Sequence, residues 1–322
     1  MAKEIELPIV DLSPFLGGDP GAKAQVAQTF ARAFEDTGFA ILVGHGVPTA
    51  LADDTYAALT RFFDQPMDAK MALSPPEKAK GRGYLPMGIE SVAKTLTGET
   101  PPDLCEALVF AAPHRPGSDT NIWPGYPPDL ASLVREWTGE MAALTQHLSR
   151  LSALALDLPE TYFAQPYANP ALTLRFVNYP DQREEPAPGQ LRYGAHHDYG
   201  ALTILRQDAA PGGLQIRDDT GTWREAPVVP DSFIVNVGDL MARWTNNRWH
   251  STLHRVSNPA RHLTGSTRRL SMVAFTGPNE GTEIACLPTC QSADNPPQFE
   301  PVTCGDYILS KIRASMELSE AK

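Results

Sequence analysis

A chain of 322 residues with 42% hydrophobic and 20% charged residues is long and apolar enough to bury a sizeable core, as one large domain or two ordinary ones. Its 24 Gly and 30 Pro residues are too few for a low-complexity chain and favour a loop-rich fold. The net charge of −11, without a Lys/Arg-rich stripe, argues against nucleic-acid binding, and no apolar run approaches the roughly 18 residues of a membrane span.

The N-terminal residues and the cysteines favour a cytoplasmic protein. Glu4 and Glu6 fall where a signal peptide has its apolar core, so we expect no secretory leader. The cysteines form no CxxC pair, and we expect reduced thiols rather than disulfides or a structural zinc site. They are Cys105, Cys286, Cys290 and Cys304.

Apolar periodicity predicts a helix-rich first part, residues 1–158. Along its last stretch, apolar residues recur at intervals of three and four, which is typical of a helix with one buried face. At about 1.5 Å per residue this helix is about 42 Å long, enough to brace a whole sheet. The expected elements are a short strand at 9–12, a helix at 22–36, a buried strand at 39–43, a helix at 51–63 and the long helix at 129–157.

Residues 159–322 have a different pattern. Short β-branched segments separated by Gly, Pro, Asn or Asp are typical of antiparallel strands in a sandwich or jelly roll. These segments are LTLRFVNYP, ALTILRQ, GGLQIRD, SFIVNVGDL, HRVSN and RRLSMVAFTG. Helices followed by strands predict an α+β chain whose helices cover one sheet face. We therefore expect a single domain over 1–322, with the jelly-roll part beginning at residue 159.

A candidate metal site begins at GAHHDYGALTIL. On an extended chain, residues two apart point the same way, so His196 and Asp198 converge on one point. A third ligand, His254 in WHSTLHRVSN, follows 56 residues after Asp198, far enough to return on a neighbouring strand. Two imidazoles and one carboxylate form the facial triad associated with iron(II) oxygenases, which leaves coordination positions open.

Two other histidines are near these ligands in the sequence. His197 lies between His196 and Asp198, so on a strand it points to the opposite face. His250 precedes His254 by four residues, but its neighbours form no wider pattern. We leave both out of the predicted metal site.

A candidate anion site lies fifteen residues after His254, in RRLSMVAF. On a strand, Arg269 and Ser271 share a face, whereas Arg268 points away. The planar guanidinium matches a carboxylate through a pair of hydrogen bonds, and the Ser hydroxyl adds another. Beyond a facial triad, this pair is expected to anchor the distal carboxylate of 2-oxoglutarate. Tyr179, in LRFVNYP, is a further candidate for the same carboxylate, although it is equally well explained as a packed residue at a strand end.

Together these residues resemble the isopenicillin N synthase-like family of iron(II)/2-oxoglutarate oxygenases, and the resemblance covers nearly the whole chain. Several motifs occur in the family's order, which is more specific than any one of them. The motifs are DTGFAILVGHGVP, GRGYLPMGIES, GAHHDYGALTIL, GGLQIRD, NVGDLMARWTNNRWHSTLHRV, RRLSMVAF and EPVTCGDYILSKI.

The resemblance implies a distorted double-stranded β-helix, or jelly roll, flanked by helices. It implies iron(II) ligands His196, Asp198 and His254, and co-substrate contacts from Arg269, Ser271 and, less securely, Tyr179. Iron(II), 2-oxoglutarate and dioxygen would oxidise an unactivated C–H bond of a small molecule, with release of succinate and carbon dioxide.

The sequence differs from the family at two positions, and the resemblance also suggests a role for one further segment. Val177 stands where many plant members have Asn near the co-substrate, and His197 replaces the small hydroxyl residue common between the ligands. Asn236, Gly238 and Asp239 match a segment that we interpret as a structural turn.

Two other functions remain open: a same-fold iron oxidase that does not use 2-oxoglutarate, and a non-catalytic small-molecule binding protein. The resemblance places the substrate pocket near residues 83–110, the strand at 174–178 and the segment after Pro278. Arg82, Tyr84 and Arg243 are possible substrate contacts, although a surface or packing role is the simpler expectation for each. Neither the substrate nor the oligomeric state is assigned.

Overall fold

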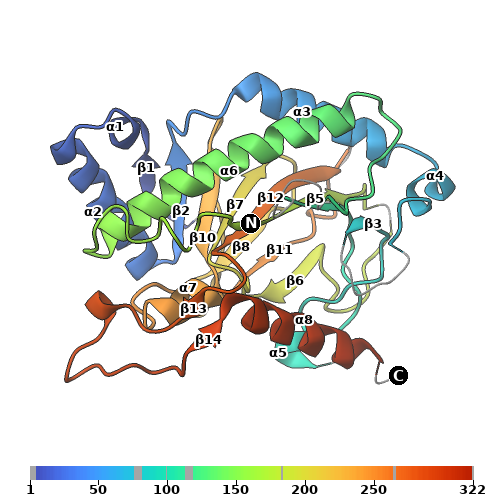
Figure 1. Cartoon of the computed structure of the whole chain (residues 1–322). Coiled ribbons are helices and arrows are strands. Elements are labelled where there is room, and N and C mark those ends of the chain that lie inside the picture. Colours follow the sequence, from blue (N-terminus) through green and yellow to red (C-terminus); the bar gives the residue numbers. More distant parts are fainter. Residues whose placement is uncertain are drawn as a thin grey trace.

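The computed structural model describes residues 5–75, 82–98, 100–112, 119–182, 184–263 and 266–320. Two sheets face each other, and a layer of helices covers the outer side of the larger one (Figure 1). The larger sheet contains, in spatial order, β1 (Ile9–Asp11), β2 (Phe39–Val43), β10 (Phe233–Val237), β7 (Leu202–Gln207), β12 (Arg269–Gly277), β5 (Ala171–Tyr179), β4 (Glu106–Ala111) and β3 (Gly83–Leu85).

The second sheet is shorter and carries both predicted histidine ligands. It contains, in spatial order, β6 (Tyr193–His196), β11 (His254–Val256), β8 (Leu214–Arg217) and β9 (Trp223–Glu225). A small hairpin pairs β13 (Glu283–Ile284) with β14 (Val302–Thr303). The helices are α1 (Ser13–Leu16), α2 (Pro20–Asp36), α3 (Thr49–Phe63), α4 (Met67–Met71), α5 (Lys94–Thr97), α6 (Leu130–Ala155), α7 (Asp239–Trp244) and α8 (Cys304–Glu320).

The long helix predicted at 129–157 is confirmed as α6, which crosses the sheet together with α2 and α3 (Figure 1). Its buried residues recur at three and four, so they form one stripe along the helix. They pack in a single core with the side chains that the sheet presents to the helices. The stripe includes Val134, Trp137, Met141, Leu144, Leu148 and Leu151.

The larger sheet has two buried faces with different partners. Along β5, Leu172, Leu174 and Phe176 belong to the core beneath the helices. The alternate residues Val177 and Tyr179 pack with Val256 of the second sheet, as the period of two in a strand requires. A residue's parity along a strand therefore decides whether it lies beneath the helices or in the space between the sheets.

Strands from both halves of the sequence join in the larger sheet. Backbone hydrogen bonds pair β2 with β10 and β4 with β5, so strands before and after residue 158 are neighbours. None of the helices in the described ranges combines the length and apolar character needed to cross a bilayer.

Candidate active site

The three predicted metal ligands come together between the two sheets. His196, the last residue of β6, is the strand partner of His254, the first residue of β11, and their rings lie 4.2 Å apart. Asp198 follows two residues beyond the end of β6. Its Oδ1 lies 3.5 Å from Nε2 of His196 and 3.7 Å from Nε2 of His254. One potential ligand atom from each residue lies within 4.8 Å of the others, which is compatible with a shared metal ion.

Hydrogen bonds leave the Nε2 atoms of both histidines free for a metal. Nδ1 of His196 lies 2.9 Å from the carbonyl oxygen of Gly194, and Nδ1 of His254 lies 3.0 Å from that of Thr252. Because a carbonyl only accepts, each Nδ1 carries the proton and each Nε2 keeps its lone pair. Burial lowers the pKa of His254 to about 4, with a further contribution from His196, so this imidazole is neutral at neutral pH.

The carboxylate of Asp198 is fixed from the opposite sheet. Its Oδ2 accepts hydrogen bonds from Oγ1 of Thr203 on β7, at 2.6 Å, and from Nδ2 of Asn236 on β10, at 2.7 Å. Burial alone would raise the pKa of Asp198, but the neighbouring rings of His254 and His196 and the hydrogen bond from Asn236 hold it below its usual range. The site therefore offers an ionised carboxylate and imidazole nitrogens, the donor set that suits iron(II).

The prediction that Asn236 belongs to a structural turn is wrong. Asn236 lies within β10, and its amide donates to Asp198, because at this position the side chain faces the space between the sheets. Gly238 does have a packing role, since a Cβ there would lie 2.3 Å from the carbonyl oxygen of Gly200. Thr203 was not singled out from the sequence. In the sequence, Asn236 and Thr203 are marked only as polar residues within otherwise apolar strand segments.

Removing the partners of Asp198 is expected to weaken iron binding without removing a ligand. Thr203→Val keeps the side-chain shape and deletes one hydrogen bond to the carboxylate, and Asn236→Ala deletes the other. Loss of such a ligand-orienting partner typically weakens metal affinity about 10–100-fold. The measurement is anaerobic competition for iron(II) against a chelator of known affinity. Thr276→Val is the matched control, because Thr276 is a buried threonine that donates to the carbonyl of Leu202 instead.

The two rejected histidines lie outside the ligand cluster. Nδ1 of His197 lies 3.4 Å from Oγ of Ser251, and the His197 side chain is only partly buried. His250 is exposed, and its backbone N–H donates to the carbonyl of Phe34. Neither residue shares the cluster formed by His196, Asp198 and His254.

Arg269 lies at another part of the same cavity and is almost completely buried. Its Nη1 donates to Oγ of Ser271, and its Nη2 donates to Oε1 of Gln207 at 2.9 Å. Its Nε has no hydrogen-bond partner in the described part of the chain, and the hydrogen-bond partners of its Nη atoms, Ser271 and Gln207, are uncharged. A buried guanidinium without a counter-charge suits a small anionic ligand.

Tyr179 lies beside this guanidinium. It is the strand partner of Arg269, whose Cζ lies 5.5 Å from the centre of the phenol ring. Burial raises the pKa of Tyr179, so the phenol stays protonated and is able to donate a hydrogen bond. Gln207, which the sequence did not indicate, orients Arg269 from β7.

A second buried arginine, Arg192, also lies near Tyr179. Its Cζ is 5.9 Å from the ring, and its guanidinium donates to the carbonyls of Pro211, Gly212 and Thr267. Burial and the charge of Arg269 lower the pKa of Arg192 to about 10, which leaves it cationic at neutral pH. Two guanidiniums therefore contribute positive charge to the region around Tyr179.

The cavity between the sheets unites the metal-ligand cluster and the predicted anion site. Val177 lines it opposite Ser271, so the departure at Val177 places an apolar side chain there. The lining residues are Phe39, Arg175, Val177, Tyr179, Tyr193, His196, Asp198, Thr203, Leu205, Leu214, Asn236, His254, Val256, Arg269, Ser271, Val273 and Phe275.

Among the residues that the structure describes, the expected substrate regions at 83–110 and after Pro278 contribute none to this lining. Tyr84 is buried beneath the helices, where its hydroxyl donates to Glu106. Arg243 lies over the ring of Phe299, with 4.9 Å between Cζ and the ring centre, and Arg82 is a partly exposed residue outside the cavity. All three therefore follow the simpler expectation of surface or packing residues.

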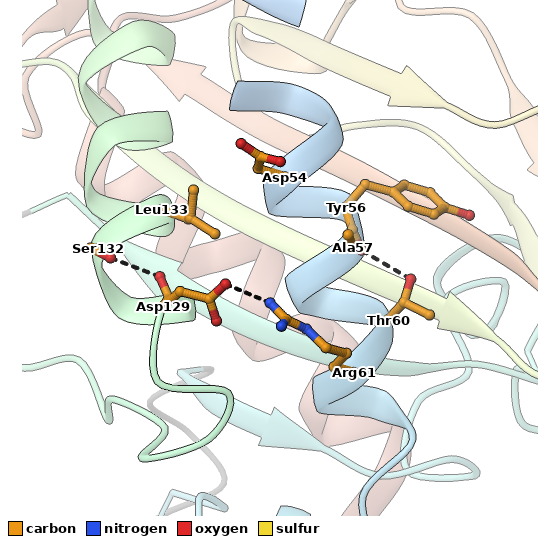
Figure 2. Close-up of a pocket in the computed structure, with 8 residues that line it drawn as sticks. All are labelled: Asp54, Tyr56, Ala57, Thr60, Arg61, Asp129, Ser132 and Leu133. Atoms are coloured by element: carbon orange, nitrogen blue, oxygen red, sulfur yellow. Dashed lines mark hydrogen bonds and ion pairs between the residues drawn. The ribbon is translucent and has the colours of Figure 1, made fainter. Parts of the chain in front are cut away.

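A larger hollow of about 820 Å³ lies on the outer surface between α3 and α6 (Figure 2). Its charged lining includes Asp54 and the ion pair between Arg61 and Asp129, in which both side chains are about half exposed. An exposed pair of this kind is well solvated and has little effect on binding or stability. The chemistry of the site therefore belongs to the smaller cavity between the sheets.

The chain is similar to known proteins of one family. One family model, described as non-haem dioxygenase in morphine synthesis N-terminal, matches residues 7–126, and a second, described as 2OG-Fe(II) oxygenase superfamily, matches residues 168–278. A 2-oxoglutarate-Fe(II) type oxidoreductase of Emericella nidulans is 33% identical over 330 residues, which cover 98% of this chain and 91% of the relative.

Two further similar proteins act on or bind named small molecules. A homoarginine-6-hydroxylase of Glycine max is 30% identical over 329 residues, with coverage of 95% of this chain and 96% of the relative. The crystal structure of a full-length Neurospora crassa protein in complex with alpha-KG and thymine superposes with a TM-score of 0.87 at 28% identity. This match covers 98% of the present chain and 100% of the Neurospora chain.

Proposed function

The chain belongs to the iron(II)- and 2-oxoglutarate-dependent oxygenases, and we propose that His196, Asp198 and His254 hold the iron while Arg269 and Ser271 hold the distal carboxylate of 2-oxoglutarate. The protein is an oxidoreductase that uses iron(II), 2-oxoglutarate and dioxygen. When bound, iron(II) and 2-oxoglutarate supply the activation of dioxygen that oxidises an unactivated C–H bond, with release of succinate and carbon dioxide.

The observation that carries the metal assignment is the convergence of the three donor atoms with their free lone pairs. The backbone carbonyls of Gly194 and Thr252 fix the histidine tautomers, and Thr203 and Asn236 fix the Asp198 carboxylate. Ligands held in place in this way bind a metal with little reorganisation. No side chain needs to act as a proton-transferring base, since the oxidising chemistry belongs to the bound groups.

The buried guanidinium of Arg269 favours the use of 2-oxoglutarate over an oxidase without this co-substrate. Ser271 and Gln207 orient the guanidinium, and the described residues offer it no carboxylate. Tyr179 is in position to add a hydrogen bond from a neutral phenol. We propose that the remaining part of the cavity receives a small-molecule substrate, as in the thymine complex of the Neurospora protein.

We also propose that residues 1–322 form one domain, with a distorted double-stranded β-helix from residue 159 onward. The support is that strands from before and after residue 158 pair in one sheet, and that the metal-ligand cluster lies between this sheet and a second one. The four cysteines carry free thiols, which supports a reducing, cytoplasmic location.

Succinate formation tests the proposed function. The anaerobically iron-loaded protein is mixed with dioxygen and 2-oxoglutarate, with and without a panel of small molecules, and succinate and oxygen consumption are both measured. We expect slow succinate formation without substrate and a large stimulation by compounds that fit the cavity. Oxygen consumption without succinate would instead support the oxidase, and no consumption of oxygen under any condition would support a binding protein.

A further inference from the structure

We propose that Arg175, with its charge neutralised by Glu90, forms the substrate-recognition end of the cavity and selects an uncharged small molecule with an amide-like head group. Such a group offers a strong hydrogen-bond acceptor without a negative charge. This inference rests on the proposed function, in which Arg269 marks the co-substrate end. It assigns a chemical class to the substrate and a specific role to an ion pair that the metal and co-substrate sites do not use.

Arg175 reaches the metal-ligand cluster from a different side than Arg269. Both arginines line the cavity. Tyr179 is the strand partner of Arg269, and Arg175 lies four residues before Tyr179 on β5. Four residues of strand span about 13 Å, so the two arginines lie at different places along the cavity. Cζ of Arg175 lies 5.4 Å from the ring centre of Tyr193, and the Tyr193 ring lies 4.9 Å from that of His196. A ligand held by Arg175 and Tyr193 would therefore lie next to the metal site.

The two guanidiniums of the cavity differ in their counter-charges. Arg175 donates to Oε1 of Glu90 through Nη1, at 3.0 Å, and to Oε2 through Nη2. Burial alone would raise the pKa of Glu90, but Arg175 lowers it below its usual value, so the carboxylate is ionised at neutral pH. The Arg175 end is therefore neutral overall, whereas the Arg269 end carries an uncompensated positive charge.

This contrast determines which head group fits each end. A carboxylate suits Arg269, but beside Arg175 it would either meet the Glu90 carboxylate or have to displace it, and an unpaired buried charge is costly. An amide meets neither obstacle, because its oxygen accepts from the guanidinium without bringing a second negative charge beside Glu90. Beyond the pair, the lining includes Val177, Val273 and Phe275, which favours an apolar body.

Glu90 is held in place by the strand that carries a metal ligand. Its backbone carbonyl accepts from the N–H of Asp103 at 2.8 Å. The Asp103 carboxylate in turn accepts from the N–H of Gly194 on β6 at 2.8 Å and from that of Val92 at 2.9 Å. Glu90 is thus tied to β6 through Asp103. The counter-charge of Arg175 is therefore held in a fixed position.

Paired probes test the inference. Each pair is a carboxamide and the carboxylate of the same small carbon skeleton, titrated calorimetrically under nitrogen into protein loaded with iron(II) and 2-oxoglutarate. In the wild type, the carboxamide is expected to bind about 10–100-fold more tightly, the effect of one hydrogen bond to a charged group. Glu90→Gln leaves the charge of Arg175 uncompensated, so it should reverse the preference toward the carboxylate. Arg175→Met should weaken both probes.

Arg206→Met is the matched control, because Arg206 forms an ion pair with Asp53 outside the cavity. It should leave the preference unchanged. The inference would be overturned if the wild type preferred the carboxylates, showed no preference, or bound neither member of any pair. It would also be overturned if Glu90→Gln weakened the binding of both probes equally, because an ion pair with a merely structural role predicts that result. The affinity for 2-oxoglutarate, titrated separately, separates the two proposals. A wild-type protein that does not bind 2-oxoglutarate would refute the proposed function. A wild-type protein that binds 2-oxoglutarate but does not prefer the carboxamide would refute this inference alone.

Discussion

Replacing His196, Asp198 or His254 with Ala is expected to abolish iron-dependent succinate formation. Each replacement removes one of the donor atoms that lie within 4.8 Å of each other, and the remaining pair no longer provides a facial triad. Asp198→Ala should reduce iron binding most, because it removes the only negatively charged residue of the three and also leaves Thr203 and Asn236 without their hydrogen-bond acceptor. The measurement is bound iron per chain after anaerobic loading and removal of excess metal, together with succinate formation.

His197→Ala and His250→Ala are the matched controls for this experiment. Both remove a histidine next to the ligands in sequence, but His197 lies beside Ser251 and His250 is exposed. Iron content should therefore stay at the wild-type level in both variants. A His254→Ala protein with full iron content and retained activity would mean that the third ligand has been misidentified, and His250 would be the next residue to test.

The elements that the sequence predicts well are those with a regular apolar pattern. The strand at 39–43 and the long helix at 129–157 appear as β2 (Phe39–Val43), which is buried on both faces, and α6 (Leu130–Ala155), which buries one continuous stripe. The predicted parity also holds: Arg269 and Ser271 line the cavity, while Arg268 points the other way and bonds to Asp64 at the exposed end of α3. Period and parity are local properties, so a sequence expresses them directly.

Contacts between strands distant in the sequence were not predictable in the same way. Asn236 and Thr203 reach Asp198 from β10 and β7, and Gln207 orients Arg269 from β7. Each depends on which strands become neighbours in space, whereas periodicity shows only which face a side chain takes. Glu90 is a further case, since it pairs with a residue 85 positions away in the chain. The sequence thus indicated the residues of the candidate metal site but not the residues that orient them.

Replacing Arg269 is expected to change the affinity for 2-oxoglutarate rather than for iron. The guanidinium is buried, bonded to Ser271 and Gln207, and without a carboxylate partner among the residues described, so a bound carboxylate would supply its counter-charge. Arg269→Ala removes this charged partner, and a loss of about 3 kcal/mol corresponds to roughly a hundredfold in affinity. Arg269→Lys keeps the charge but loses the planar fork, so its effect should be smaller yet measurable.

The measurement is an anaerobic titration of 2-oxoglutarate into the iron(II)-loaded variants, followed by the metal-to-ligand charge-transfer absorption. Ser271→Ala removes a single hydrogen bond and should weaken binding less than Arg269→Ala. Arg268→Ala is the control on the same strand, because its guanidinium bonds to Asp64, Asn178 and the carbonyl of Thr60 on the helix side. It should lower the unfolding temperature but leave 2-oxoglutarate affinity intact. If Arg268→Ala weakened co-substrate binding more than Arg269→Ala, the carboxylate would have to bind elsewhere, since parity places only Arg269 in the cavity.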